Sequence, residues 1–82
     1  MTETQIREAI LQCIKEVAPE ADIDHINPAL RFRDQFSFDS VDFLNFTGKL
    51  RQIMNVVIPE SDFPKLITLN ACTEYLRSKL NG

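Results

Sequence analysis

A serine next to an aspartate, at the predicted start of a helix, is the residue best placed to do chemistry in this chain. The surrounding stretch reads Phe38-Asp39-Ser40-Val41-Asp42-Phe43-Leu44. It joins an irregular segment to one with apolar helical periodicity, so Ser40 is expected in the first turn of that helix. Backbone N–H groups of a first turn have no partner within the helix and favour a bound phosphate. Ser40 is therefore a candidate site for a phosphate linkage, and Asp39 is the candidate helix cap.

Other reactive groups are sparse. The single His and the 2 Cys do not have the spacing of metal ligands, and we find no Ser-His-Asp set and no pair of catalytic carboxylates. Cys13 and Cys72 both fall on predicted apolar helix faces, so we expect buried free thiols. The sequence therefore predicts no metal site and no enzymatic activity of the chain's own.

Composition predicts one small globular domain over residues 1–82, with 44% hydrophobic residues and only 2 Gly. The net charge of -3 argues against a nucleic-acid partner, which usually requires a basic face. No apolar run approaches the roughly 20 residues that cross a bilayer, and residues 1–5 lack the features of a signal peptide. We expect a cytoplasmic monomer that does not insert into membranes.

Two of three expected main helices lie on either side of a long connection. The first covers about residues 4–18 and begins with a capping box of Thr2 and Gln5. The connection, residues 19–39, has regularly placed apolar residues, so we expect it to be held by packing, with a helical turn after Pro28. The second helix begins at residue 39 or 40 and runs to about residue 54. Its expected inner stripe is Val41, Leu44, Leu50, Ile53 and Met54, flanked by Phe43 and Phe46.

Gly48 interrupts the second helix, at a cost of up to about 1 kcal/mol relative to Ala. The simplest reason for it is close approach by another chain or by an attached group. After this helix, residues 55–59 read as a connector and residues 62–66 as a short helix with Pro64 in its first turn. Thr68 is expected to cap the last helix, which ends at Asn81-Gly82. The predicted fold is all-α: three main helices, one short helix and no sheet.

Two stretches of this sequence resemble the acyl carrier protein family. The first is similar to the family's Leu-x-x-Asp-Leu-Gly-x-Asp-Ser-Leu pattern and reads Leu30-Arg31-Phe32-Arg33-Asp34-Gln35-Phe36-Ser37-Phe38-Asp39-Ser40-Val41-Asp42. The second is similar to its Ile-x-Ile-Pro-x-x-Asp and Thr-Val elements and reads Val56-Val57-Ile58-Pro59-Glu60-Ser61-Asp62, followed by Ile67-Thr68-Leu69. With chain length and helix order, the resemblance covers the whole sequence.

The resemblance implies a four-helix bundle whose serine, here Ser40, carries a 4′-phosphopantetheine arm. A phosphopantetheinyl transferase would attach the arm from coenzyme A, with Asp39 helping to hold Mg²⁺. The arm's thiol would carry acyl groups as thioesters for a loading ligase or synthase and for downstream acyl-processing enzymes of lipid or secondary-metabolite synthesis. Two other interpretations stay open: an aminoacyl or peptidyl carrier loaded by an adenylating ligase, and a small helical adaptor with an unmodified Ser40.

Three departures from the family pattern suggest a specialised member. The family's second helix is usually strongly acidic, whereas this one carries Lys49 and Arg51. Ser37 replaces the usual Gly, in a slot that favours a backbone angle serine tolerates poorly. Phe63, if it points inward, would fill part of an acyl cavity, which predicts short or unusual cargo. The positions expected to contact partners are Val41, Asp42, Phe43, Asn45, Lys49 and Arg51. The positions expected to line a cargo cleft are Leu44, Ile58, Phe63 and Leu66.

Overall fold

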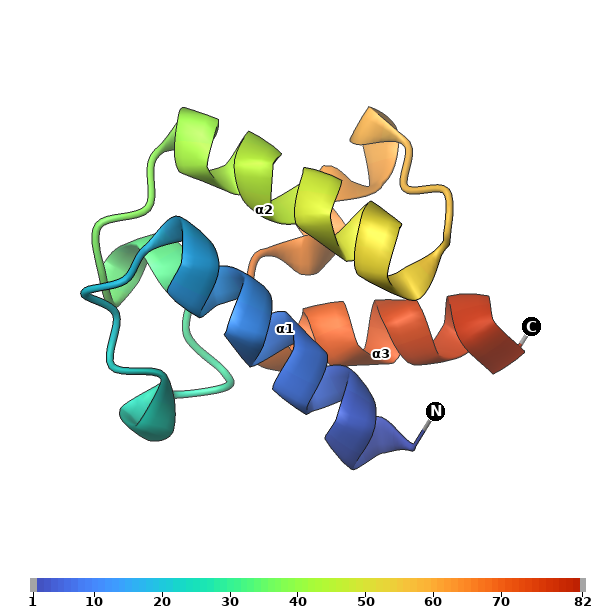
Figure 1. The fold of residues 1–82 in the computed structure, drawn as a ribbon, viewed down its shortest axis with the longest axis horizontal. Helices are drawn as coiled ribbons and strands as arrows, with labels where there is room; N and C mark the ends of the chain where they lie inside the picture. The colour runs from blue at the N-terminus through green and yellow to red at the C-terminus, as the bar shows by residue number, and fades with distance from the viewer. Residues whose placement is uncertain (1, 82) are drawn as a thin grey trace.

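The computed structural model describes residues 2–81, and over this range it contains helices and no strand (Figure 1). The three α-helices are α1 (Glu3–Val17), α2 (Ser40–Met54) and α3 (Leu69–Asn81), and the three 3₁₀ helices are η1 (Ile23–His25), η2 (Phe32–Asp34) and η3 (Glu60–Leu66). An isolated bridge joins Arg31 to Thr68. The predicted all-α fold is confirmed, while the expected helix end at Gly82 lies outside the described residues.

Helix α1 packs against both other α-helices (Figure 1). The Thr2 side chain accepts the Gln5 N–H at 3.1 Å, and the Gln5 side chain accepts the Thr2 N–H at 2.9 Å, which confirms the predicted capping box. Its apolar face is buried in the core and consists of Ile6, Ile10, Cys13 and Ile14. This face is the surface on which α2 and α3 are assembled.

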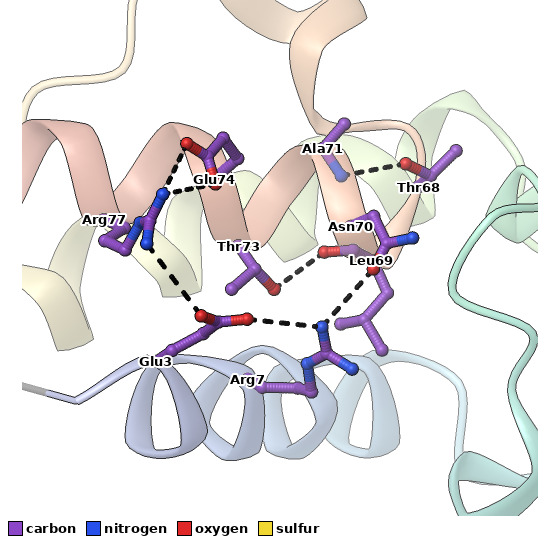
Figure 2. A network of polar contacts seen from close by, with 9 residues as sticks. All are labelled: Glu3, Arg7, Thr68, Leu69, Asn70, Ala71, Thr73, Glu74 and Arg77. Carbon is purple, nitrogen blue, oxygen red and sulfur yellow. Dashed lines mark hydrogen bonds and ion pairs between the residues drawn. The ribbon is translucent and has the colours of Figure 1, made fainter.

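Polar contacts across the outside of the bundle add to the packing of α1 on α3. Figure 2 shows Glu3 between Arg7, at 3.8 Å, and Arg77, at 4.0 Å, with Arg7 also donating to the Asn70 side chain at 3.3 Å. On α3, Thr68 caps the helix as predicted, because its hydroxyl accepts the Ala71 N–H at 3.0 Å (Figure 2). The contacts of Glu3 with the two arginines and of Arg7 with Asn70 are exposed, so they contribute little beside the apolar core.

The connection between α1 and α2 is held by hydrogen bonds and by packing, as its apolar spacing predicted. The Gln35 side chain accepts the Asn27 N–H at 2.7 Å and donates to the carbonyls of Asn27 and Leu30. The Phe32 N–H donates to the Ile67 carbonyl at 3.0 Å, which ties the connection to the segment before α3. The turn expected after Pro28 corresponds to η2, whereas η1 was not predicted.

The predicted inner face of α2 is wrong at three positions. Val41, Leu44 and Ile53 are 64%, 52% and 50% exposed, and the buried residues of the helix are Phe46, Thr47, Leu50 and Met54. Phe46 lies edge-on to Phe32 and Phe38, with ring centroids 5.7 Å from each. Burying an aromatic ring removes more apolar surface from water than burying a valine, so Phe46 determines which face turns inward.

One local expectation also needs correction. Pro64 lies inside the helix rather than in its first turn, because η3 begins at Glu60, two residues earlier than predicted. Its missing N–H removes one possible bond to Ser61, which is exposed and can pair with water instead. A Cβ added at Gly48 would meet nothing within 4 Å in the described chain, so the expected close approach by another chain or by an attached group stays a prediction.

A hydrogen bond fixes η3 on α3. The Tyr75 hydroxyl donates to the Asp62 carboxylate at 2.6 Å, and Lys65 lies 3.5 Å from the same carboxylate. The Tyr75 bond holds the pKa of Asp62 below its usual value, with a further contribution from Lys65. Burial, followed by the bond to Asp62, raises the pKa of Tyr75 to about 12. Both shifts favour the bonded state at neutral pH.

We expect Gly48→Ala to raise the free energy of unfolding by about 0.4–1 kcal/mol, because alanine restricts the unfolded chain and the added methyl fits without a clash. Urea unfolding followed by circular dichroism measures this as a higher midpoint at an unchanged slope. A lower midpoint would mean that the helix backbone is crowded at this position.

Tyr75→Phe removes the bond to Asp62 and should lower the urea midpoint at pH 7. Because the folded pKa of Asp62 is depressed, its stabilising contribution is present above the unfolded pKa of 3.8 and is lost as the pH falls through the lower folded value. The difference in urea midpoint between the wild-type protein and the Tyr75→Phe variant should therefore shrink below about pH 4. A difference that stays constant down to pH 2 would assign the effect to packing of the ring alone.

Candidate functional site

Ser40 is the first residue of α2 and is exposed, as expected. Asp39 is the N-cap: its Oδ1 accepts the Asp42 N–H at 2.9 Å, and Asp42 Oδ2 accepts the Asp39 N–H at 3.2 Å. Phe43 N–H then donates to the Asp39 carbonyl at 2.9 Å, which is the first bond of the helix. This reciprocal cap sets the point at which the helix begins and places the Ser40 side chain beside its N-terminal end.

The first turn retains hydrogen-bonding capacity for an anion. Within residues 2–81, the backbone N–H groups of Ser40 and Val41 donate to no acceptor. A phosphate linked to Ser40 Oγ would lie near both donors, which fits the phosphate linkage expected from the sequence. The carboxylates of Asp39 and Asp42 already interact favourably with the positive end of the helix dipole. A phosphate would therefore be bound mainly by hydrogen bonds from these two N–H groups.

An open groove of about 860 Å³ begins beside Ser40 and runs between the start of α2 and η3. Its lining comes from the connection before α2, from the first turn of α2 and from η3 with the residue that follows it. The lining residues are Arg31, Phe32, Arg33, Phe38, Asp39, Ser40, Phe43, Leu44, Glu60, Phe63, Pro64 and Ile67. An apolar group attached at Ser40 could therefore lie against protein rather than in water.

The residues expected to contact partners do not form one uniform surface. Val41, Asn45 and Arg51 are exposed, whereas Asp42 is engaged in the cap and Lys49 lies 3.6 Å from Glu16 on α1. Phe43 is half-buried: its ring contacts other aromatic rings and lines the groove, so it is not part of an exposed aromatic patch.

The structure divides the predicted cleft residues into two pairs. Leu44 and Phe63 line the groove beside Ser40. Ile58 and Leu66 are 1% and 0% exposed and belong to the core instead. The expected strain at Ser37 is absent: among the described residues other than glycine, only Asn55, at the end of α2, has a positive φ.

Sequence reasoning missed the cations of the groove. Arg31 and Arg33 flank the buried Phe32 and contribute to the groove lining. Arg31 forms an ion pair with Asp34 at 2.8 Å, while Arg33 has no ion-pair partner within residues 2–81. The spacing of the apolar residues did not indicate this position, because Phe32 and Arg33 lie in the short 3₁₀ helix η2 and not in an extended segment or an α-helix.

The chain's own thiols are inaccessible. Cys13 and Cys72 are both free and buried. Burial, with a smaller effect of Glu16, raises the pKa of Cys13 to about 11, and burial raises the pKa of Cys72 further. Because the thiolate is the reactive form, neither residue is suited to carry a thioester. No group of three or more possible metal ligands occurs in the part of the chain that the structure describes, and no helix there is long and apolar enough to span a membrane.

Comparison with known proteins agrees with this geometry. The family described as "Phosphopantetheine attachment site" matches residues 8–76. An acyl carrier protein of Lactobacillus johnsonii is 33% identical over 99% of this chain and 100% of its own length. Another, from Chlorobium phaeobacteroides, is 30% identical over 96% of this chain and 100% of its own length. A family match over most of the chain, together with relatives aligned along their full length, shows that this protein belongs to the acyl carrier protein family.

Proposed function

We propose that this protein carries acyl groups as thioesters on a 4′-phosphopantetheine arm attached to Ser40. The observation that carries the proposal is the exposed hydroxyl of Ser40 at a capped helix start, next to an apolar groove and to two backbone N–H groups that have no acceptor within residues 2–81. The arm supplies the thiol that the chain itself lacks at its surface. The protein then acts as a carrier without catalytic activity of its own, and the reactions of the thioester take place on partner enzymes.

Attachment of the arm is a phosphoryl-transfer step catalysed by a separate transferase. Ser40 Oγ attacks the phosphorus that bears the pantetheine group of coenzyme A, and a phosphodiester bond forms. The bond between that phosphorus and the bridging oxygen of the diphosphate breaks, 3′,5′-ADP leaves with the bridging oxygen, and the Oγ proton passes to a base of the transferase. Ser40 is exposed, so its hydroxyl is accessible to such an enzyme.

Asp39 would help the transferase without giving up its role as the cap. Its Oδ1 accepts the Asp42 N–H, whereas its Oδ2 has no hydrogen-bond partner within residues 2–81. A carboxylate oxygen is a preferred ligand of Mg²⁺. Oδ2 is therefore available to a Mg²⁺ ion that also holds the diphosphate of coenzyme A.

The partners proposed for this carrier are dedicated ones, because the exposed face of α2 is not acidic. From Asn45 to Met54 the helix has no carboxylate and carries Lys49 and Arg51. Charges at the rim of an interface control association and the choice of partner more than affinity. Enzymes that recognise an acidic carrier helix would therefore bind this protein weakly.

Incubation with coenzyme A, Mg²⁺ and a broad-specificity phosphopantetheinyl transferase should add the mass of one phosphopantetheine group, as measured by intact mass spectrometry. Ser40→Ala should abolish the gain. Ser61→Ala is the matched control, because Ser61 is also an exposed serine, follows the groove residue Glu60 and should not affect modification.

Asp39→Asn is expected to slow the modification while keeping the helix start, since asparagine is also a good N-cap. If the wild-type protein gained no mass in the transferase assay, this result would contradict the proposal and favour a helical adaptor. Modification that persists in Ser40→Ala would assign the arm to another residue.

Binding to fatty-acid synthase enzymes that use acidic carriers should be weak, and reversing both α2 cations with Lys49→Glu and Arg51→Glu should strengthen it. Titration calorimetry at low and high salt measures the effect, which should fade as salt screens the added charges. The control, Arg77→Glu with Lys79→Glu, makes the same change in net charge on α3. Tight, salt-sensitive binding by the wild-type protein would show that it serves ordinary fatty-acid synthesis.

A further inference from the structure

We propose that Phe43 and Phe63 form a wall between α2 and η3 that confines the acyl group to the outer groove and makes this a carrier of short acyl groups. The inference rests on the proposed function, because it concerns the group held on the Ser40 arm.

The wall consists of two rings from different elements. Phe43 on α2 and Phe63 on η3 meet edge to face, with centroids 5.4 Å apart and an interplanar angle of 80°. Phe43 is supported from the core side by Phe38, at 6.2 Å, and by Phe46, at 6.1 Å. The pair is thus an extension of the aromatic core, and both of its rings also line the groove beside Ser40.

The η3 side of the wall is held in place by α3. Asp62, the residue before Phe63, accepts the Tyr75 hydroxyl at 2.6 Å and pairs with Lys65 at 3.5 Å. These contacts restrain η3 next to the ring. Opening the wall would require η3 to move away from α3 or both rings to leave their favourable edge-to-face geometry.

The interior on the far side of the wall is filled. Ile58 and Leu66, expected from sequence to line a cleft, are fully packed, and Leu50 on α2 is buried as well. An alkyl chain therefore finds apolar contact in the groove but no enclosed cavity between α2 and η3. The groove is open to solvent, so methylenes added to a chain that lies in it keep one side in contact with water and should give the thioester little further protection.

The experiment compares thioesters of increasing length on the intact protein. Butyryl-, octanoyl- and dodecanoyl-coenzyme A serve as donors for the transferase, intact mass verifies loading, and hydroxylamine cleavage measures how accessible each thioester is. Wild-type protein should lose the three groups at similar rates. On the Phe63→Ala variant, hydroxylamine should cleave the octanoyl thioester at least about three-fold more slowly than the butyryl thioester. The space opened by the substitution would remove the additional methylenes from water.

Two further variants separate the wall from general loosening of the core. Phe63→Leu retains apolar contact and should give a smaller effect, whereas Phe36→Ala removes a half-buried ring that contacts Phe32 and Phe38 but not Phe63, and should leave cleavage independent of length. Cleavage that slows with chain length in the wild type would overturn the wall. A folded Phe63→Ala variant whose cleavage rate does not depend on acyl chain length would also overturn it. If none of the three donors loaded Ser40, that result would instead overturn the proposed function, and this inference with it.

Discussion

The reciprocal cap between Asp39 and Asp42 is the interaction on which the site depends. Each carboxylate accepts the backbone N–H of the other residue, so α2 can begin only at Ser40. That single start point leaves the hydroxyl exposed and sets the direction in which Phe43 leaves the helix. It also leaves the N–H groups of Ser40 and Val41 without an acceptor in the described part of the chain, so they can bind a phosphate. A helix that began one residue later would place Ser40 at the cap and its hydroxyl on the backbone.

The aromatic residues connect this helix start to the rest of the protein. All six phenylalanines belong to one set of ring contacts that runs from Phe36 and Phe32 in the connection, through Phe38 and Phe46, to Phe43 and Phe63. The set holds the long connection against α2 although that connection contains only two short 3₁₀ helices. The same rings form the apolar surface beside Ser40, so the core and the groove are one continuous structure.

Local rules predicted much of the fold and the position of Ser40. The Thr2 and Thr68 caps and the start of α2 depend on side chains within three residues, and each was found where the sequence placed it. The inner face of α2 was not predicted correctly, because Val41 and Phe46 cannot both face the core. Phe46 faces it because its ring contacts Phe32 and Phe38 in the connection. The groove depends on segments far apart in sequence, so the position of Arg33 on its wall could not be read from periodicity.

We propose that Ser40 bears the arm in the cell. Tandem mass spectrometry of the protein purified from its natural source tests it most directly, by mapping modifications to the peptide that contains residues 34–49. We expect a fragment released from phosphopantetheine on this peptide, and we expect the modification to be assigned to Ser40. A peptide recovered only in the unmodified form, or an arm located on another residue, would contradict it.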